Sequence, residues 1–275
     1  MAKLYTRKEL DERLRNEIAA GRPLFMTNAG CGLTAKLQAM GGTDIIIVSP
    51  TSYWRMKGQS SINAFMPSAN SVECIRSILP EISAVVDEAP LGVLYNCHNP
   101  LQDDVKILSE FKEQGVCAVN PLMVKAYGEA FNARLDSFGI GWQRELDIIK
   151  ICHDLDMYTL SYAYTPEEAK ILAGEGTDMI FSHLGQTIGG LLGSHAKMTL
   201  DEAVELSAAI FDAAREANPN ILLMLHGGSL TTPEDVEYVY KRTNADGFVG
   251  GSAAERLPIE QSVLNATKSF KSYSR

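Results

Sequence analysis

The 275-residue sequence lacks the features that mark several large classes of protein. It has no run of about twenty apolar residues, which a transmembrane helix requires. It has no block of Lys and Arg, and its net charge of −9 does not suit a nucleic-acid backbone, which attracts clustered positive charge. Its first residues form a charged helical pattern without the apolar core of a signal peptide. We therefore expect a cytoplasmic protein with no membrane and no nucleic-acid partner.

Motifs that hold common cofactors are also scarce. The 5 cysteines are odd in number and lack CxxC spacing, so we expect reduced thiols and no zinc site. No GxGxxG follows the first predicted strand, and no lysine ends a predicted strand, which disfavours a Schiff-base aldolase. The predicted strand ends carry no cluster of acidic residues, so the sequence does not indicate a metal held by the protein. No cofactor is evident from the sequence. The alternative that it leaves open is a Mg²⁺ ion chelated by the substrate.

Short apolar runs predict eight strands. Most runs are continuously apolar rather than alternating, which is typical of parallel strands buried on both faces. They are Leu24–Ala29, Asp44–Ser49, Leu91–Asn96, Val116–Asn120, Tyr158–Ala163, Met179–His183, Ile221–His226 and Gly247–Gly251.

Helical patterns separate these runs and carry the expected start signals. Thr165, Thr199 and Thr232 stand where an N-cap hydroxyl is favoured, each before an acid of the first turn. The alternation predicts a (β/α)₈ TIM barrel, one α/β domain over residues 1–275, with a doubly wound open sheet as the alternative. The pattern over Arg7–Ala20 predicts an N-terminal capping helix, which is also our candidate contact for a homo-oligomer.

Two connections are longer than a barrel requires. They are Ser49–Asn70, after the second predicted strand, and Pro121–Gly141, after the fourth. Both leave the carboxyl ends of strands, where barrel enzymes build their active sites. We expect substrate contacts or lids there, with decoration or an oligomer contact as the alternative.

Polar side chains gather at the carboxyl ends of the predicted strands. His183 and His226 each end an apolar run and precede a glycine or a Leu-Gly pair, and imidazoles there can transfer protons near neutral pH. Histidines tied to the backbone are the alternative, but two in adjacent units favour function. His98 stays open between these roles, whereas His153 and His195 are interpreted as structural and surface residues. The remaining ends supply Asn28, Ser49, Asn96, Asn120, Ser161, Tyr162 and Ser252.

Glycine-rich turns follow the seventh and eighth runs, within Ile221–Ser229 and Gly247–Ala253. Such turns let backbone N–H groups and helix N-termini approach an anion. We therefore predict a small anionic substrate, with Arg55 as a charged clamp and the Thr187 hydroxyl as an oxyanion donor. The predicted substrate-binding residues are Asn28, Ser49, Arg55, Asn96, Thr187, Gly228, Ser229, Gly251 and Ser252.

Glu145 begins a predicted helix directly after the second long connection. A carboxylate there can act as a base, or it can simply complement the helix dipole. Its position alone favours the dipole.

Four segments carry a recognisable combination of motifs. They are AGCGLTAKLQAMGGTDIIIV, RMKGQSSI, the long stretch from WQREL to TIGG over residues 142–190, and the closing HGG and GGSAAERLP. Together they resemble the phosphoenolpyruvate hydrolase-like family, whose members are also described as TIM-barrel signal transduction proteins. The resemblance runs from about Leu4 to Tyr273 and implies a (β/α)₈ barrel that hydrolyses an oxo acid or an enol phosphate. A related barrel forms the C-terminal half of some plant antiviral-resistance proteins.

The resemblance also bears on individual residues. It makes Glu145 a site residue, and it implies roles for the motif positions Gly30, Gly32, Arg55, Gly58, Ser60, His183, Gly185, Thr187, Gly189 and Gly190. Distant relatives of the family bind Mg²⁺ through an Asp cluster near the third strand, whereas that strand ends here in YNCHNP. SPTSYWRM likewise replaces the usual Asn-Ser-Gly-type turn. These departures argue against a protein-held metal and for a different substrate.

The sequence therefore predicts an enzyme that cleaves a C–C bond, or a C–P or C–O bond, of a small anionic oxo acid. His183, His226 and Glu145 are the predicted catalytic residues, with histidine as general acid/base in a hydrolytic or lyase-type reaction. The alternative is a metabolite-binding signalling barrel without turnover, which would tolerate loss of the histidines.

Overall fold

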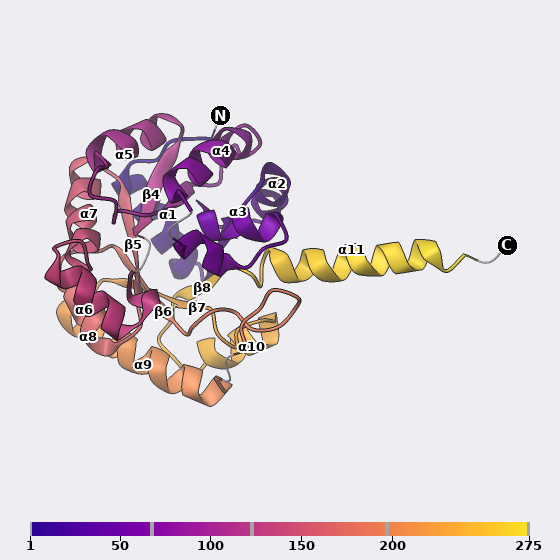
Figure 1. Ribbon diagram of the computed structural model, residues 1–275. Helices are drawn as coiled ribbons and strands as arrows, with labels where there is room; N and C mark the ends of the chain where they lie inside the picture. Colours follow the sequence, from indigo (N-terminus) through magenta and orange to yellow (C-terminus); the bar gives the residue numbers. More distant parts are fainter. Residues whose placement is uncertain (1, 67–68, 122–123, 196–197, 274–275) are drawn as a thin grey trace.

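Eight parallel strands form a closed barrel in the computed structural model, which describes residues 2–66, 69–121, 124–195 and 198–273 (Figure 1). Neighbouring strands pair in sequence order, and β8 pairs with β1 to close the ring. The predicted (β/α)₈ barrel is confirmed, and every strand lies within one residue of its predicted ends. The strands are β1 (Leu24–Ala29), β2 (Ile45–Val48), β3 (Leu91–Tyr95), β4 (Val116–Pro121), β5 (Tyr158–Ala163), β6 (Met179–His183), β7 (Leu222–His226) and β8 (Gly247–Gly250).

A ring of helices covers the outside of most of the barrel. Thr165, Thr199 and Thr232 cap α8, α9 and α10 as predicted, because each hydroxyl accepts a hydrogen bond from a backbone N–H of the first turn. Apolar side chains of the ring and the outward-facing strand residues form the outer core. The ring helices are α2 (Gly32–Met40), α4 (Ser71–Ser83), α5 (Asp104–Glu113), α7 (Gln143–Asp154), α8 (Pro166–Gly174), α9 (Leu200–Ala217) and α10 (Pro233–Tyr240).

Helix α1 (Arg7–Ala19) caps the amino-terminal end of the barrel, as predicted. Its Leu10 and Leu14 are fully buried in the same core as Met26 of β1. Arg7 fixes the start of the helix through a bond of 2.6 Å to Asp178. The apolar face of α1 is therefore used inside its own barrel. Within the described residues, no helix is long and apolar enough to cross a bilayer.

Both long connections contain helices that the sequence analysis did not predict. The first contains α3 (Pro50–Met56) and the short η1 (Ser61–Phe65), and the second contains η2 (Val124–Tyr127) and α6 (Glu129–Ser137). The two connections touch, because the rings of Tyr127 and Phe65 lie 5.8 Å apart and the Tyr127 hydroxyl donates to the Phe65 carbonyl. They meet at the carboxyl end of the barrel, which is where a lid must lie. Parts of both connections, residues 67–68 and 122–123, fall outside the described residues.

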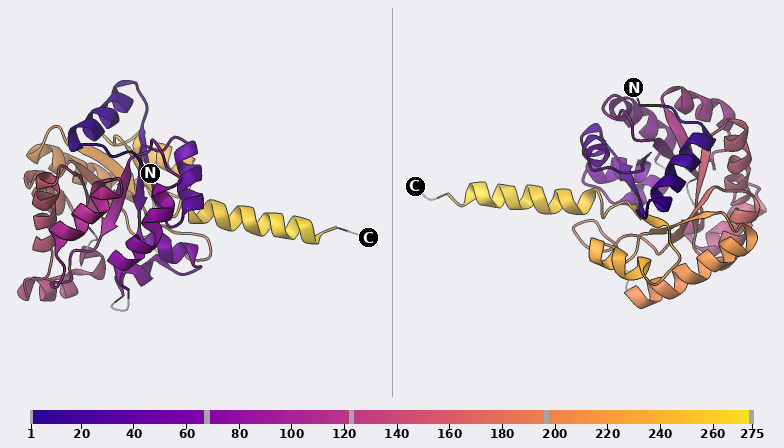
Figure 2. Two further views of the ribbon diagram at one scale, coloured as in Figure 1. Left: turned by 90° about the horizontal axis from the view of Figure 1, so that it is seen from above. Right: turned by 180° about the vertical axis from the view of Figure 1, so that it is seen from behind.

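The last helix, α11 (Arg256–Lys271), points away from the barrel (Figures 1 and 2). It leaves the ring at the carboxyl end of β8. It is the one labelled helix in Figure 1 that stands clear of the ring along most of its length.

Candidate active site

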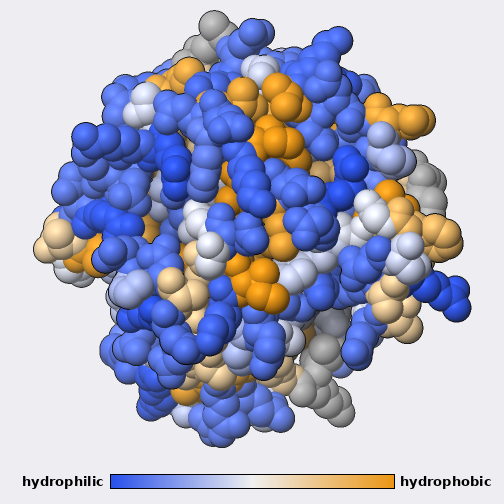
Figure 3. All heavy atoms as spheres, turned by 90° about the vertical axis from the view of Figure 1, so that its left-hand side faces the viewer, coloured by the Kyte–Doolittle hydropathy of each residue, from blue (hydrophilic) through white to orange (hydrophobic). Residues whose placement is uncertain are grey.

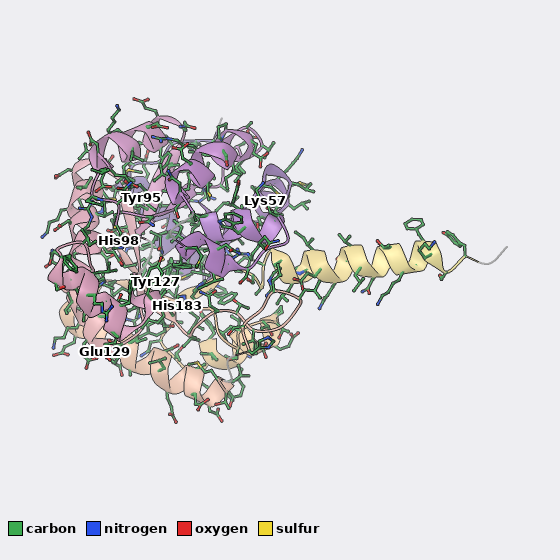
Figure 4. All side chains as sticks on the ribbon, in the orientation of Figure 1. Lys57, Tyr95, His98, Tyr127, Glu129 and His183 are labelled. Atoms are coloured by element: carbon green, nitrogen blue, oxygen red, sulfur yellow. The ribbon has the colours of Figure 1, made fainter. Side chains whose placement is uncertain are left out.

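Inward-facing polar residues form the last layer of the barrel at its carboxyl end. Side chains alternate along a strand, so Asn28 faces the interior like the core residue Met26 two positions earlier. The same alternation turns Asn120, Tyr162, His183 and His226 inward. Asn28 and Asn120 are both buried, and the Asn120 amide has no hydrogen-bond partner among the described residues. Figure 4 labels His98, Tyr127 and His183, which lie within the ring of helices and come from different elements.

This layer opens into a small cavity of about 40 Å³, which adjoins an outer hollow of about 170 Å³. Ser61, Gln186, Thr187 and Ser252 line both spaces and form the passage between them. Seven of the predicted catalytic and binding residues line the inner cavity. The cavity is lined by Asn28, Thr51, Arg55, Ser61, Phe65, Leu94, Tyr162, His183, Gly185, Gln186, Thr187, His226, Gly251 and Ser252.

His183 and His226 lie side by side at the ends of β6 and β7. They are register partners, and their ring centroids are 5.1 Å apart. The ring of Tyr162 packs against both, at 5.1 and 5.0 Å. Burial lowers the pKa of His226 to about 4 and holds the pKa of His183 well below its usual value of 6.5. Both imidazoles are therefore neutral at pH 7.

The two imidazoles hold their protons on opposite nitrogens. The Gly185 N–H donates to Nδ1 of His183 over 3.1 Å, so the proton of that ring is on Nε2. Nδ1 of His226 lies 2.9 Å from the Val249 carbonyl, which only accepts, so this ring carries its proton on Nδ1. His183 therefore offers an Nε2–H donor, and His226 offers an Nε2 lone pair.

Arg55 of α3 lines the cavity, but its N–H groups donate hydrogen bonds to other residues of the chain. Its Nε and Nη2 donate to Oε2 of Glu255 over 3.3 and 3.0 Å. Its Nη1 donates to the hydroxyls of Thr51 and Ser61 over 3.3 and 3.1 Å, and Nη2 also donates to Ser52. A guanidinium has about five N–H donors, so this set uses all of them.

Glu255 is the site residue that the sequence analysis missed. Its side chain is 0% exposed, and its second oxygen accepts from the Gly30 N–H at 2.8 Å and the Thr34 hydroxyl at 3.1 Å. It thus ties the turn after β8 to the turn after β1 and to α3. Gly30 must be glycine there, because a Cβ would lie 2.3 Å from the Ser52 carbonyl. The only sequence signal for Glu255 was its place in GGSAAERLP, next to a turn already predicted to bind an anion.

The glycine turn after β7 serves mainly to join loops. The Gly228 N–H donates to the Gly185 carbonyl at 2.9 Å, and the Gly228 carbonyl accepts from Ile188 at 3.1 Å. Helix α10 begins only at Pro233, and Thr232 with Asp235 satisfies its first turn in a capping box. Gly251 and Ser252 line the cavity, whereas the predicted binding residues Gly228 and Ser229 do not.

Glu145 lies beside the cavity and contacts His98. It is buried at the start of α7, and its Oε1 is 3.2 Å from Nε2 of His98. Nδ1 of His98 faces the Ile140 carbonyl at 3.2 Å, so both ring nitrogens face acceptors.

Two other predicted binding residues have local partners. The Ser49 hydroxyl is 2.7 Å from that of Thr51, and the Asn96 carboxamide oxygen accepts from the His98 N–H at 2.9 Å. Neither lines the cavity. His153 contacts Asp178 at the amino-terminal side of the barrel, and His195 is exposed.

Comparisons with known proteins agree with this architecture. A family model described as phosphoenolpyruvate hydrolase-like matches residues 9–273. The ToMV susceptible protein tm-1(GCR26) of Solanum lycopersicum is 32% identical over 265 residues, which are 96% of this chain and 35% of that protein. The chain thus spans about a third of the length of this curated relative.

Solved structures share the fold at low sequence identity. Phosphonopyruvate hydrolase in complex with oxalate and Mg²⁺ superposes with a TM-score of 0.62 at 15% identity, covering 95% of this chain and 87% of that one. Oxaloacetate acetylhydrolase gives a TM-score of 0.59 at 12% identity, covering 96% and 87%.

The residues of this chain do not fit a protein-held Mg²⁺. The ion prefers carboxylate oxygens, whereas the strand ends that face the cavity supply amides, imidazoles and a phenol. Both carboxylate oxygens of Glu255 already accept hydrogen bonds from other residues of the chain. Across the described ranges, no group of three or more His, Cys, Asp or Glu side chains is arranged to hold a metal.

Proposed function

Because the chain belongs to the phosphoenolpyruvate hydrolase-like family, we propose that its barrel is an enzyme that cleaves a carbon–carbon bond of a small anionic oxo acid. The observation that carries the proposal is the pair of neutral cavity histidines, whose remaining nitrogens are one donor and one acceptor. Two barrels of the same fold are named as hydrolases of such acids, which supports the substrate class.

The two histidines divide the proton transfers between them. Nε2 of His226 takes a proton from a water molecule as the water oxygen bonds to the oxo carbon. The carbon–carbon bond then breaks, and the carbon that leaves takes its electron pair and a proton from Nε2 of His183. General acid and base groups of this kind each contribute about 10²- to 10⁴-fold to a rate.

The cycle closes within the pair. His226 gives up the proton that it took from water as His183 loses its own, so that His183 does not become an imidazolate, and the ring centroids are 5.1 Å apart. Transfer of that proton, directly or through one water, restores both starting tautomers. Net consumption is one water molecule, and its two hydrogens end on the two products.

The fixed donors of the cavity hold the substrate. Asn28, Thr187 and Ser252 with the Gly251 backbone surround the histidine pair and offer neutral donors to a carboxylate and to the developing oxyanion. Glu145 acts one step away: it orients His98 at the edge of the mouth, as a positioning residue rather than as the base.

The state of Arg55 favours carbon–carbon over carbon–phosphorus cleavage. A phosphono group carries nearly two negative charges and is normally met by uncompensated cations. The Arg55 guanidinium is instead neutralised by Glu255 and has its N–H groups engaged. The cavity therefore suits a carboxylate or an enolate better than a phosphonate.

The test is a turnover assay with oxaloacetate, phosphonopyruvate and phosphoenolpyruvate, with products followed by NMR. We expect the wild type to consume the carbon–carbon substrate, and His183→Gln and His226→Gln to bind it while losing about 10²- to 10⁴-fold in kcat. The exposed His195→Gln is the matched control and should keep full activity. Equal activity in all variants would contradict the assigned roles.

A metabolite-binding signalling barrel is the second candidate. The observation that favours it is the set of neutral donors in the cavity, Asn28, Thr187 and Ser252, which can hold a metabolite without any proton transfer by the histidines. The same assay separates the two functions, because binding without consumption by the wild type would select the signalling barrel.

A further inference from the structure

The outer hollow at the mouth of the barrel is larger than the cavity that holds the histidines. Its volume is about 170 Å³, against about 40 Å³ for the inner cavity. His183 and His226 line the inner cavity and not the outer hollow, so the proposed proton transfers use only the smaller space. The outer hollow is therefore a part of the site to which the proposed function gives no role.

Hydroxyl groups make up most of the polar lining of the outer hollow. They belong to Ser60, Ser61, Thr187, Ser194 and Ser252. A hydroxyl can donate one hydrogen bond and accept others. The Ser61 oxygen accepts from Nη1 of Arg55 at 3.1 Å, so its own O–H can still donate to a ligand. Such a lining suits a ligand group that both donates and accepts, and a hydroxyl is the simplest group of that kind.

The outer hollow carries no charge along its described lining. None of the described residues that line it is Lys, Arg, His, Asp or Glu, and Ile62 and Leu192 supply its apolar part. Strongly hydrophilic side chains cover most of the side of the molecule drawn in Figure 3, so the lack of charge is a property of the hollow and not of the surface in general. A carboxylate or phosphate in the hollow would lose part of its hydration and meet no cation in return.

The proposed cleavage requires a carbonyl group at the entrance to this hollow. The bond between two carbons breaks readily when the leaving carbon can pass its electron pair to an adjacent carbonyl and become an enolate. A ketone accepts the pair more readily than a carboxylate, whose enolate would carry two negative charges. With the oxo acid in the inner cavity, this carbonyl lies in the passage, where the hydroxyls of Thr187 and Ser252 can donate to its oxygen.

We propose, building on the proposed carbon–carbon cleavage, that the substrate is a 2,4-dioxo acid with one carboxylate, whose short hydroxyl-bearing tail beyond C4 lies in the outer hollow. The water oxygen bonds to C2, the C2–C3 bond breaks, and its electron pair passes to the C4 oxygen as an enolate. C3 then takes a proton from Nε2 of His183. The products are hydrogen oxalate and a methyl ketone, which together contain both hydrogens of the water, so no further reactant is needed.

Binding measurements test the tail without depending on turnover. Isothermal titration calorimetry with His226→Gln compares 5-hydroxy-2,4-dioxopentanoate, 2,4-dioxopentanoate and 2,4-dioxohexanedioate, which carry a hydroxymethyl, a methyl and a carboxymethyl tail. We expect the hydroxymethyl tail to bind roughly tenfold more tightly than the methyl tail, the effect of about one net hydrogen bond. The carboxymethyl tail should bind most weakly. Equal affinity for the three acids would overturn the proposal.

A change of charge in the hollow shows whether the tail lies there. Leu192→Arg places a cation in the lining and should make the carboxymethyl tail the preferred one. Leu191→Arg is the matched control, because Leu191 is 83% exposed and does not line the hollow, and it should keep the wild-type order. An unchanged order in Leu192→Arg, or the same reversal in both variants, would overturn the placement of the tail.

Turnover by the wild type separates this proposal from the proposed function. Binding in the expected order without consumption of any of the acids would contradict the cleavage and support the assignment of the tail to the outer hollow. Consumption of oxaloacetate with a kcat/KM equal to that of the hydroxylated acid would overturn the 2,4-dioxo acid and leave the cleavage intact. Oxalate and a methyl ketone in the NMR spectrum are the expected products, and pyruvate in their place would overturn attack at C2.

Discussion

His183 and His226 are register partners whose rings lie 5.1 Å apart, yet they hold their protons on opposite nitrogens. The difference comes from the backbone around them: an N–H of the turn after β6 faces one Nδ1, and a carbonyl of β8 faces the other. Two identical side chains thereby become one donor and one acceptor. This division makes the site chemically useful without a charge on either ring.

The pH dependence of the activity should reflect this neutrality. The pKa of His226 is lowered to about 4 by burial, so its lone pair stays available well below the usual histidine range. We expect kcat/KM for the carbon–carbon substrate to be level through pH 6.5 and to fall only as pH approaches 4. A loss centred near pH 6.5 would show that an ordinary, solvated histidine is the base.

The same pKa shift predicts an effect on stability. A histidine with a depressed pKa in the folded protein takes up its proton more readily when the chain unfolds, so unfolding is favoured as pH falls from 6.5 toward 4. Urea unfolding of wild type and His226→Gln at pH 7 and pH 4.5 measures this. The wild type should lose more stability than the variant over that interval, and equal losses would contradict the shift.

Glu255 should contribute more to the free energy of unfolding than its position in a turn suggests. Glu255→Gln leaves the buried guanidinium of Arg55 uncompensated, and removing one member of a buried pair typically costs about 3–5 kcal/mol. The double variant Glu255→Gln/Arg55→Met removes both charges and should recover part of that loss. Chemical denaturation of wild type and these two variants measures the loss and its recovery, and a single variant within about 0.5 kcal/mol of wild type would contradict the prediction.

Gly30 provides a test of the same junction through packing alone. A Cβ there would lie 2.3 Å from the Ser52 carbonyl, so Gly30→Ala must push α3 away from β1 and disturb Arg55. Gly41→Ala is the matched control, because its Cβ would meet its nearest atoms at an ordinary 3.4 Å. We expect Gly30→Ala to lower the thermal midpoint and the activity, while Gly41→Ala changes neither by much.

The barrel could be predicted from the sequence because its strands are short, continuous apolar runs and its helices begin at recognisable caps. The inward polar layer also followed, since Asn28, His183 and His226 stand at strand ends whose register the fold fixes. These are local patterns, and the closed barrel converts them directly into positions.

The partners of those residues could not be predicted in the same way. The bond between Arg55 and Glu255 joins residues 200 positions apart, and no periodicity marks it. The histidine tautomers depend on single backbone groups. The outward direction of α11 had no signal in the sequence, because its residues form the same helical pattern whether or not they pack on the barrel.

Metal dependence is the property on which this barrel should differ from the Mg²⁺-bound phosphonopyruvate hydrolase that shares its fold. The side chains at the strand ends are neutral, so fixed hydrogen-bond donors must stabilise the oxyanion. Removing one such donor typically costs about 2.7–4 kcal/mol of transition-state stabilisation. We expect dialysis against EDTA to leave kcat unchanged on the carbon–carbon substrate. A loss that Mg²⁺ restores would instead assign the ion to the substrate itself, chelated by its oxo and carboxylate oxygens. The Thr187→Val variant separates the two cases, because it should lower kcat when the protein supplies the donors and have little effect when the ion does.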